Sequence, residues 1–384
     1  MFFKKLSYSS LLFSMMLLSG ALKPFILTYI GNFDVVLLVS ILAILYIFKN
    51  KGKLNKTIID PSIVLLLFTA YIVLSWTYTT SHSYVFNKTF SYCLNLLFFI
   101  FPFFLKQLNV KQWIWIYGII LIPLTYFFIQ MKAILWTSLA PDDSFMDLKS
   151  NYLALGYHLG VLLVLLNYYK QSVIIQIIVF ILLFGSSARG PLLFAIITLI
   201  IINVQDVKAL LSNLIKRFGY VIFVLGITFI VFIVFKDKIM PLLDNALQRF
   251  DRIGTDNDKS LGARYEFFEF AFYKPFDSLS TLFFGFGFGS FGKEFFNEDM
   301  RAYPHNILLE IFFELGLVGL IIFLVFLILV FKLIFRSKNI FTFILLFSIL
   351  NAAKSYNLAD SWVLFMFFGC SLREFKEDEN LILI

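Results

Sequence analysis

Long apolar runs separated by short polar connections limit the folds open to this chain more than any other feature. The first run, within residues 1–30, is long enough to span a bilayer and predicts an uncleaved helix rather than a cleaved signal peptide. Further runs occupy residues 33–48, 61–79, 89–105, 112–131, 152–169, 172–186, 190–204, 219–235, 306–332, 339–353 and 357–373. The pattern predicts an all-α polytopic membrane protein with about twelve transmembrane helices, since a helix of roughly 20 apolar residues crosses a bilayer.

The composition supports this class. Hydrophobic residues make up 60% of the 384 residues, charged residues make up 15%, and the mean hydropathy is +0.88. No single soluble core could bury this much apolar surface, so membrane lipid is the expected surrounding. The net charge of +8 is explained by basic cytoplasmic loops, and no nucleic-acid partner is expected.

The basic residues of the short loops predict the orientation in the membrane. With the N-terminus inside, most of them fall on the cytoplasmic side, among them Lys4, Lys5, Lys216, Arg217 and Arg336. The opposite short loops keep only Lys88, Lys132, Lys149, Arg189 and Lys354. By the positive-inside rule, both termini are predicted to be cytoplasmic.

The one long hydrophilic segment, residues 236–304, then falls on the outer side between the ninth and tenth predicted helices. This predicts three parts: an N-terminal transmembrane bundle of about nine helices over residues 1–235, the outer loop, and about three helices with a cytoplasmic tail over residues 305–384. Within the loop, residues 265–273 alternate apolar pairs with acids, which is typical of an amphipathic helix at a membrane interface.

The junction between this loop and the next apolar run carries a histidine and a polar helix face. His305 follows Pro304, and Asn306, Glu310 and Glu314 recur every four residues, so they share one face of the expected helix. Inside a membrane this face cannot point at lipid. A lone histidine at a helix start commonly has no special role. Here a carboxylate one turn away, or Asn306, could orient the ring, which makes His305 a candidate general base.

Two arginines allow both an ordinary and a functional interpretation. Arg189 lies between small residues and a Gly-Pro break at an outer helix end. It is either a snorkelling loop residue or part of an anion site in which the guanidinium binds phosphate oxygens. Arg264 lies at the start of the amphipathic stretch. It forms either a solvated ion pair of small energetic value or a second cationic contact to the same anion.

Phe284 to Gly292 is glycine-rich, and Gly287, Gly289 and Gly292 match the spacing of a dinucleotide fingerprint. We reject that interpretation, because the fingerprint requires a βαβ unit. The segment is expected to be a tight turn toward the bilayer or a phosphate cradle. The three dispersed histidines have no metal-ligand spacing, so neither a metal nor a cofactor is predicted.

Together these motifs resemble the O-antigen ligase and O-antigen polymerase superfamily. The specific part is Pro304-His305-Asn306-Ile307-Leu308-Leu309-Glu310 followed by Glu314-Leu315-Gly316-Leu317-Val318-Gly319. Arg189-Gly190 and Gly262-Ala263-Arg264 are shorter motifs of the same set. The resemblance covers about the C-terminal half of the chain.

The resemblance implies a GT-C-like membrane glycosyltransferase at the outer, periplasmic face of the bacterial inner membrane. Such enzymes take a glycan from an undecaprenyl-diphosphate carrier. By this resemblance Arg189 and Arg264 would bind the diphosphate without a metal, and His305 would accept a proton from the acceptor hydroxyl. Gly287, Gly289 and Asn306 would also contact the donor, and Glu310 and Glu314 would orient the site.

Three functions stay open at this point. A ligase would attach the glycan to lipid A-core, and a polymerase would extend another carrier-linked glycan. Only one outer loop is long, and neither arginine fits the Arg-x10-Gly pattern of polymerases, which favours a ligase. A transporter, suggested by the polar residues inside apolar runs, would show pseudo-symmetric halves and broken helices.

Overall fold

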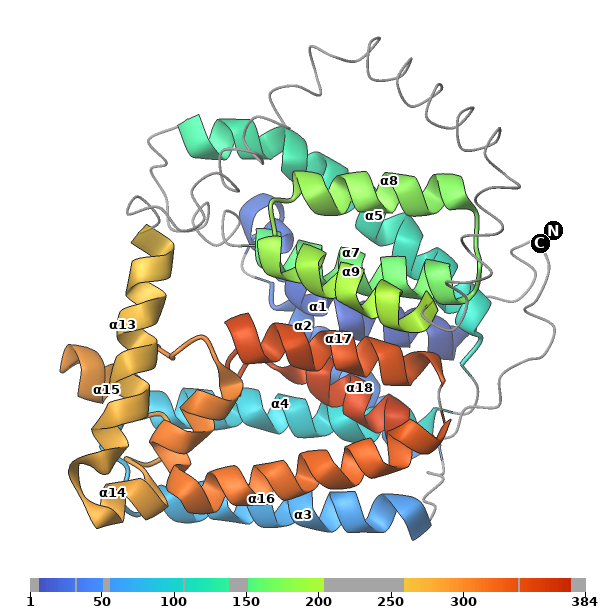
Figure 1. Cartoon of the computed structure of the whole chain (residues 1–384). Coiled ribbons are helices and arrows are strands. Elements are labelled where there is room, and N and C mark those ends of the chain that lie inside the picture. The colour runs from blue at the N-terminus through green and yellow to red at the C-terminus, as the bar shows by residue number, and fades with distance from the viewer. Residues whose placement is uncertain are drawn as a thin grey trace. The chain divides into compact units, whose positions relative to one another are not determined.

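The structure, a computed structural model, describes residues 7–31, 33–50, 56–105, 108–137, 151–203, 259–337 and 339–373. Every regular element within these ranges is a helix (Figure 1). Their bounds are α1 (Tyr8–Tyr29), α2 (Val35–Lys49), α3 (Lys56–Ser75), α4 (Tyr84–Phe104), α5 (Val110–Thr137), α7 (Tyr152–Tyr168), α8 (Val173–Gly185), α9 (Arg189–Asn203), α13 (Lys259–Tyr273), η2 (Lys274–Asp277), α14 (Leu279–Phe284), α15 (Phe291–Phe296), α16 (Ile307–Ser337), α17 (Ile340–Ser355) and α18 (Trp362–Leu372).

The predicted all-helical class is confirmed for these residues. The predicted span 219–235 lies outside the described residues, and each other predicted span overlaps a described helix. Among the described residues, four helical segments are long and apolar enough to cross a membrane: α1, α4, Val110–Met131 of α5 and Ile307–Lys332 of α16. The count of about twelve spans and the side of each loop stay predictions that rest on helix length.

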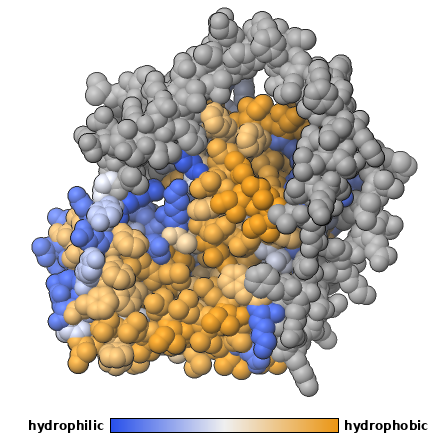
Figure 2. Space-filling model, in the orientation of Figure 1, coloured by the Kyte–Doolittle hydropathy of each residue, from blue (hydrophilic) through white to orange (hydrophobic). Residues whose placement is uncertain are grey.

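Large apolar side chains cover the outside of the helices. Leu66 on α3 is 65% exposed and Ile328 on α16 is 64% exposed. Figure 2 shows apolar residues over the face that α3 and α16 form, and hydrophilic residues at the end where α13 and α15 lie. This is the surface expected of helices that face lipid tails, because lipid makes apolar exposure favourable.

The chain forms two compact units, and α1 and α5 are each divided between them. The second unit comprises residues 20–33 and 117–257, and within its described part α7 packs against α8 and α9. His158 is fully enclosed in α7, where its Nδ1 lies 2.7 Å from the hydroxyl of Tyr117. This histidine is a satisfied core residue.

The first unit comprises residues 1–19, 34–116 and 258–383. Here α4 packs against α18 and α16 packs against α3, with aromatic rings between them. Between α4 and α18, the ring centres of Tyr92 and Phe365 are 6.1 Å apart. Between α3 and α16, the ring centres of Phe68 and Phe323 are 5.2 Å apart. α13 runs crosswise to α16 at one end of these helices (Figure 1).

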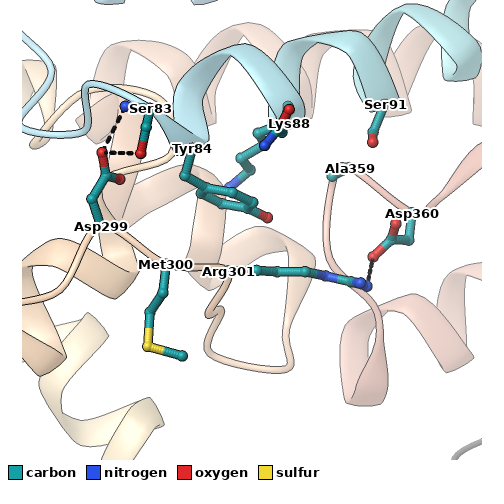
Figure 3. A pocket seen from close by; sticks show the side chains of 10 residues that line it. Ser83, Tyr84, Lys88, Ser91, Asp299, Met300, Arg301, Ala359 and Asp360 are labelled. Carbon is teal, nitrogen blue, oxygen red and sulfur yellow. Dashed lines mark hydrogen bonds and ion pairs between the residues drawn. The ribbon is translucent and has the colours of Figure 1, made fainter. Parts of the chain in front are cut away.

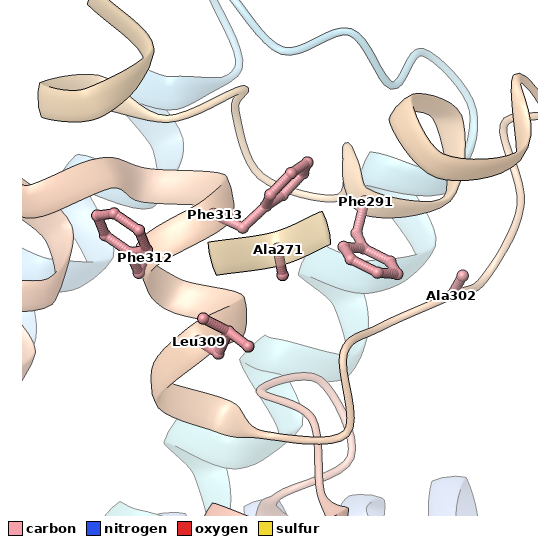
Figure 4. Packing of buried hydrophobic residues seen from close by; sticks show 6 residues of the cluster. All are labelled: Ala271, Phe291, Ala302, Leu309, Phe312 and Phe313. Carbon is pink, nitrogen blue, oxygen red and sulfur yellow. The ribbon is translucent and has the colours of Figure 1, made fainter. Parts of the chain in front are cut away.

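A helix, α13, covers residues 265–273, where an amphipathic helix is expected, and part of its apolar surface packs on protein. Ala271 belongs to a buried cluster that α13 shares with α15 and the first turns of α16 (Figure 4). Phe267 and Phe270 pack against this cluster. The cluster consists of Ala271, Phe291, Ala302, Leu309, Phe312 and Phe313. Burial of these rings fixes α13 against the start of α16 and so positions the residues between them.

Candidate active site

α16 is broken at Gly316, two residues after the last member of its polar face, Glu314. Gly316 has φ 64° and ψ −166°, which is non-helical and is accessible mainly to glycine. A Cβ added to Gly316 would lie 2.3 Å from the carbonyl oxygen of Phe283, and one added to Gly285 would lie 2.4 Å from the carbonyl oxygen of Glu314. The two glycines therefore let the segment after α14 approach the backbone of α16 closely.

The break releases carbonyl groups that the neighbouring chain then satisfies. The backbone N–H of Phe286 donates to the carbonyl of Phe313 at 3.1 Å, and that of Gly287 donates to the carbonyl of Glu314 at 2.8 Å. The hydroxyl of Tyr71 donates to the carbonyl of Leu315 at 3.1 Å. Such replacement bonds are needed because an unpaired backbone group in a membrane costs several kcal/mol.

The polar face of α16 is paired with a buried lysine. Lys88 Nζ donates to Glu310 Oε1 at 2.5 Å and to Glu314 Oε1 at 2.6 Å, and each of the three residues is 1% exposed. The ammonium also lies 4.8 Å from the centre of the Phe288 ring, a cation–π contact. We call Lys88, Glu310 and Glu314 the buried ion cluster.

The prediction that Lys88 lies in an outer loop is wrong. Lys88 lies within α4, in the interior of the first unit. The prediction failed because the positive-inside rule counts a lysine as a loop residue, whereas a buried lysine is tolerated when carboxylates surround it. Its partners lie more than 200 residues further along the chain, which no local pattern reveals.

Backbone groups bind the second oxygen of each carboxylate, and Glu314 Oε2 also accepts from Lys88 Nζ at 2.7 Å. The N–H of Leu358 donates to Glu310 Oε2 at 2.7 Å, and the N–H of Gly289 donates to Glu314 Oε2 at 3.0 Å. The N–H groups of Gly287 and Gly289 thus both donate to Glu314, one to its backbone and one to its side chain. This arrangement favours the tight-turn interpretation of the glycine segment over a phosphate cradle.

His305 lies directly before this cluster, at the entrance of α16. Its backbone has φ 57°. Its ring is stacked on that of Phe267, with the ring centres 6.1 Å apart, and packs edge-on against that of Tyr303, with the ring centres 4.5 Å apart. Asn306 caps the helix, because its Oδ1 accepts from the N–H groups of Leu308 and Leu309 at 3.0 Å. The left-handed residue and the cap fix the direction in which the ring leaves the helix end.

The surroundings of His305 keep its ring neutral at pH 7. Burial lowers its pKa to about 4, the positive charge of Arg264 acts in the same direction, and a hydrogen bond to the backbone of Ser355 opposes them. A backbone bond that raises a histidine pKa has the ring as its donor. One ring nitrogen is then the donor, and the other keeps a lone pair that can accept a proton.

Arg264 lies close enough to His305 for its positive charge to act on the imidazole. Arg264 is half-buried on α13, three residues before Phe267, and residues three apart share one helix face. Phe267 stacks on His305, and the electrostatic effect of Arg264 reaches the imidazole. In such an arrangement the cation can stabilise an anionic leaving group, and the neutral imidazole can act as a base.

Arg189 belongs to the second unit, and its convergence with Arg264 and His305 stays a prediction. It is half-buried as the first residue of α9. The small residues before it serve close packing, because a Cβ added to Gly156 of α7 would lie 2.3 Å from the Cβ of Ala188. A guanidinium at the first turn of a helix is compatible with anion binding, since the backbone N–H groups there point outward.

The described helices and this site define a multi-pass membrane protein with a polar, histidine-containing centre at one end of its helices. A family model described as O-antigen ligase matches residues 174–324, a range that contains Arg189, Arg264, His305 and the two glutamates of the buried ion cluster. The match confirms the resemblance to the O-antigen ligase superfamily over this part of the chain. A search of curated proteins found no match.

Proposed function

We propose that this protein transfers a glycan from undecaprenyl diphosphate to an acceptor hydroxyl at the outer face of the bacterial inner membrane. The proposed acceptor is lipid A-core, so the protein would be an O-antigen ligase. Both of its termini would lie in the cytoplasm. The observation that carries the proposal is the position of His305, whose ring lies between Phe267 and Tyr303 within the influence of the Arg264 charge, at the head of a broken membrane helix.

In the proposed reaction, the acceptor oxygen attacks the anomeric carbon of the first sugar while the bond from that carbon to the diphosphate oxygen breaks. The electron pair of the broken bond leaves with the diphosphate, and the acceptor proton passes to the free nitrogen of His305. Arg264 and Arg189 would stabilise the growing negative charge in the place of a divalent metal ion. Asn306, Glu310 and Glu314 would hold the helix end that carries the base.

A repeat-unit polymerase of the same superfamily is the second candidate. It uses the same donor, the same departure of the diphosphate and the same base, and differs only in its acceptor, which is another carrier-linked glycan. The absence of the polymerase Arg-x10-Gly pattern at Arg189 and Arg264 favours the ligase. An acceptor assay with each class of substrate separates the two.

A transporter is favoured less, although the break at Gly316 is a feature that this hypothesis also predicts. In transporters, the carbonyls of an unwound segment coordinate the transported ion. Here the carbonyls of Phe313, Glu314 and Leu315 accept hydrogen bonds from the protein itself. The break therefore serves the docking of residues 283–287.

The test is complementation of a strain that lacks the gene, with surface glycan as the readout. His305→Ala and Arg264→Ala should each abolish glycan attachment while the protein still inserts in the membrane. His82→Ala and Lys274→Ala are matched controls, because His82 is exposed and Lys274 forms only a surface pair with Asp277. Wild-type levels of surface glycan with His305→Ala would refute the proposal.

A further inference from the structure

A polar cavity of about 410 Å³ lies in the first unit beside the buried ion cluster (Figure 3). Its walls come from the start of α4, from residues 299–301 of the segment before α16, and from the connection between α17 and α18. The volume falls in the range of roughly 300–1,000 Å³ that is usual for small-molecule sites. None of the cavity residues was singled out for binding by the sequence.

The charges around the cavity disfavour an anionic ligand. Both cations of its lining are already paired, Arg301 with Asp360 and Lys88 with the two glutamates. The remaining carboxylate, Asp299, accepts hydrogen bonds from the hydroxyls of Ser81 and Ser83 and from the backbone N–H groups of His82 and Ser83. When the two glutamates behind Lys88 are counted, four carboxylates surround two cations, which disfavours a diphosphate.

Neutral polar groups fill the wall that α4 contributes. Tyr84, Asn87 and Ser91 recur at three- and four-residue spacing and so share one helix face. The side chains of Asn87 and Ser91 make no hydrogen bond to any residue that the structure describes, and the ring of Tyr84 projects from α4 between Lys88 and Arg301 (Figure 3). An amide, a hydroxyl and an aromatic face are the groups that bind sugar hydroxyls and the apolar face of a pyranose.

The cavity is connected to the proposed base through Tyr303. This ring contacts His305 at 4.5 Å, and its hydroxyl hydrogen-bonds to the side chain of Asn357. Asn357 in turn donates to Asp360 Oδ2 at 2.8 Å, the same oxygen that accepts from Arg301 at the cavity wall. Asp360, Asn357 and Tyr303 therefore form a continuous row of side-chain contacts from the cavity wall to His305.

We propose that this cavity binds a neutral sugar residue of the glycan substrate and so positions the glycan against His305. The inference rests on the proposed function, and it adds a site for the sugar that is separate from the arginines assigned to the diphosphate. Ser91 and Asn87 would bind sugar hydroxyls, and Tyr84 would pack on the ring face.

The test measures binding of a delipidated glycan by saturation-transfer NMR with the full-length protein in nanodiscs. The probe is the surface oligosaccharide of the host strain, released from its lipid by mild acid, so that it carries neither lipid nor diphosphate. The wild type should bind it. Ser91→Phe, which fills the cavity, should abolish the signal, and Asn87→Ala should weaken binding about tenfold, the loss of one or two hydrogen bonds.

The controls separate this inference from the proposed function. Ser280→Phe changes an exposed serine outside the cavity and should bind like the wild type. His305→Ala should keep binding although transfer is lost, and inorganic diphosphate should not displace the glycan. Wild-type binding by Ser91→Phe, no binding by the wild type, or displacement by diphosphate would each overturn the inference, even where transfer assays succeed. Glycan binding without transfer would overturn the proposed function alone.

Discussion

Two ion pairs of the first unit, formed by residues near one another, differ in their surroundings and so in what they do. The buried ion cluster joins Lys88 of α4 to Glu310 and Glu314 of α16, with every member 1% exposed. The pair between Arg301 and Asp360 lies at the cavity, where the two side chains are 60% and 26% exposed. Water is excluded from the buried ion cluster, so the loss of one partner there is strongly destabilising. Water screens the pair between Arg301 and Asp360, so that pair contributes little to stability.

This difference suggests a division of roles. The buried ion cluster fixes the broken end of α16 against α4, and so fixes the position of His305. The exposed pair can rearrange at low cost, which suits the wall of a binding cavity. The following predictions test the difference, beginning with the largest expected effect.

Lys88→Met should have the largest effect on stability. Removing the lysine leaves two buried carboxylates without their cation, and breaking a buried pair costs about 3–5 kcal/mol. Thermal unfolding in detergent, followed by size-exclusion chromatography, measures the loss. The triple variant Lys88→Met, Glu310→Gln, Glu314→Gln should recover part of the stability because it removes the charges together. A Lys88→Met variant that melts at the wild-type temperature would mean that the cluster does not hold the helix.

Gly316→Ala should have the next largest effect. An alanine at φ 64° is strained by about 1–3 kcal/mol, and its Cβ would also meet the backbone of Phe283. The matched control is Gly262→Ala, since a Cβ on that glycine of α13 would meet no atom within 4 Å. The same unfolding assay should show a clear loss for Gly316→Ala and none for Gly262→Ala. Equal melting temperatures of the two variants would contradict the claim that the break in α16 requires a glycine at position 316.

The pH dependence of transfer should reflect the lowered pKa of His305. Because this pKa is about 4 in the folded protein, the ring stays neutral and able to accept a proton from pH 8 down to about pH 5. kcat/KM should be constant over that range and fall as the pH approaches 4, where the ring gains a proton. Lowering the pH from 6.5 toward 4 should also reduce stability, because the unfolded state binds the proton more readily. A fall in kcat/KM centred near pH 6.5 would contradict the described surroundings of the ring.

Arg301→Gln should have the smallest effect on stability. The pair with Asp360 is exposed, and exposed pairs contribute about 0–1 kcal/mol. The melting temperature should therefore stay within a few degrees of the wild type. Destabilisation as large as that of Lys88→Met would show that exposure does not separate the two ion pairs.

The fold class could be predicted from the sequence because the length and hydropathy of each apolar run are properties of that run alone. Each apolar run marks a helix without reference to the rest of the chain, and the described helices begin and end close to the predicted spans. The polar face of Asn306, Glu310 and Glu314 was likewise visible, since helical periodicity is local. The helix over residues 265–273 could be placed in the same way, and α13 covers these residues.

The partners of these residues could not be predicted, because they come from distant parts of the chain. Nothing near Lys88 in the sequence indicates that it meets two glutamates of α16. One signal was present: two acids on an apolar helix require a cation, and a lysine beside an apolar run is a candidate. The cavity depends on three separated segments and left no comparable signal.

The central claim is that His305 is the base of a glycosyl transfer. The most direct test is a reconstituted assay in proteoliposomes without a transmembrane gradient, with carrier-linked glycan as donor and lipid A-core as acceptor. Wild type should transfer glycan and release undecaprenyl diphosphate, whereas His305→Ala should be slower by about 100-fold or more. His82→Ala should transfer glycan like the wild type. His305→Ala should melt at the wild-type temperature, unlike Lys88→Met, so that its loss of transfer is one of chemistry and not of folding. Transfer by His305→Ala at the wild-type rate would contradict the account.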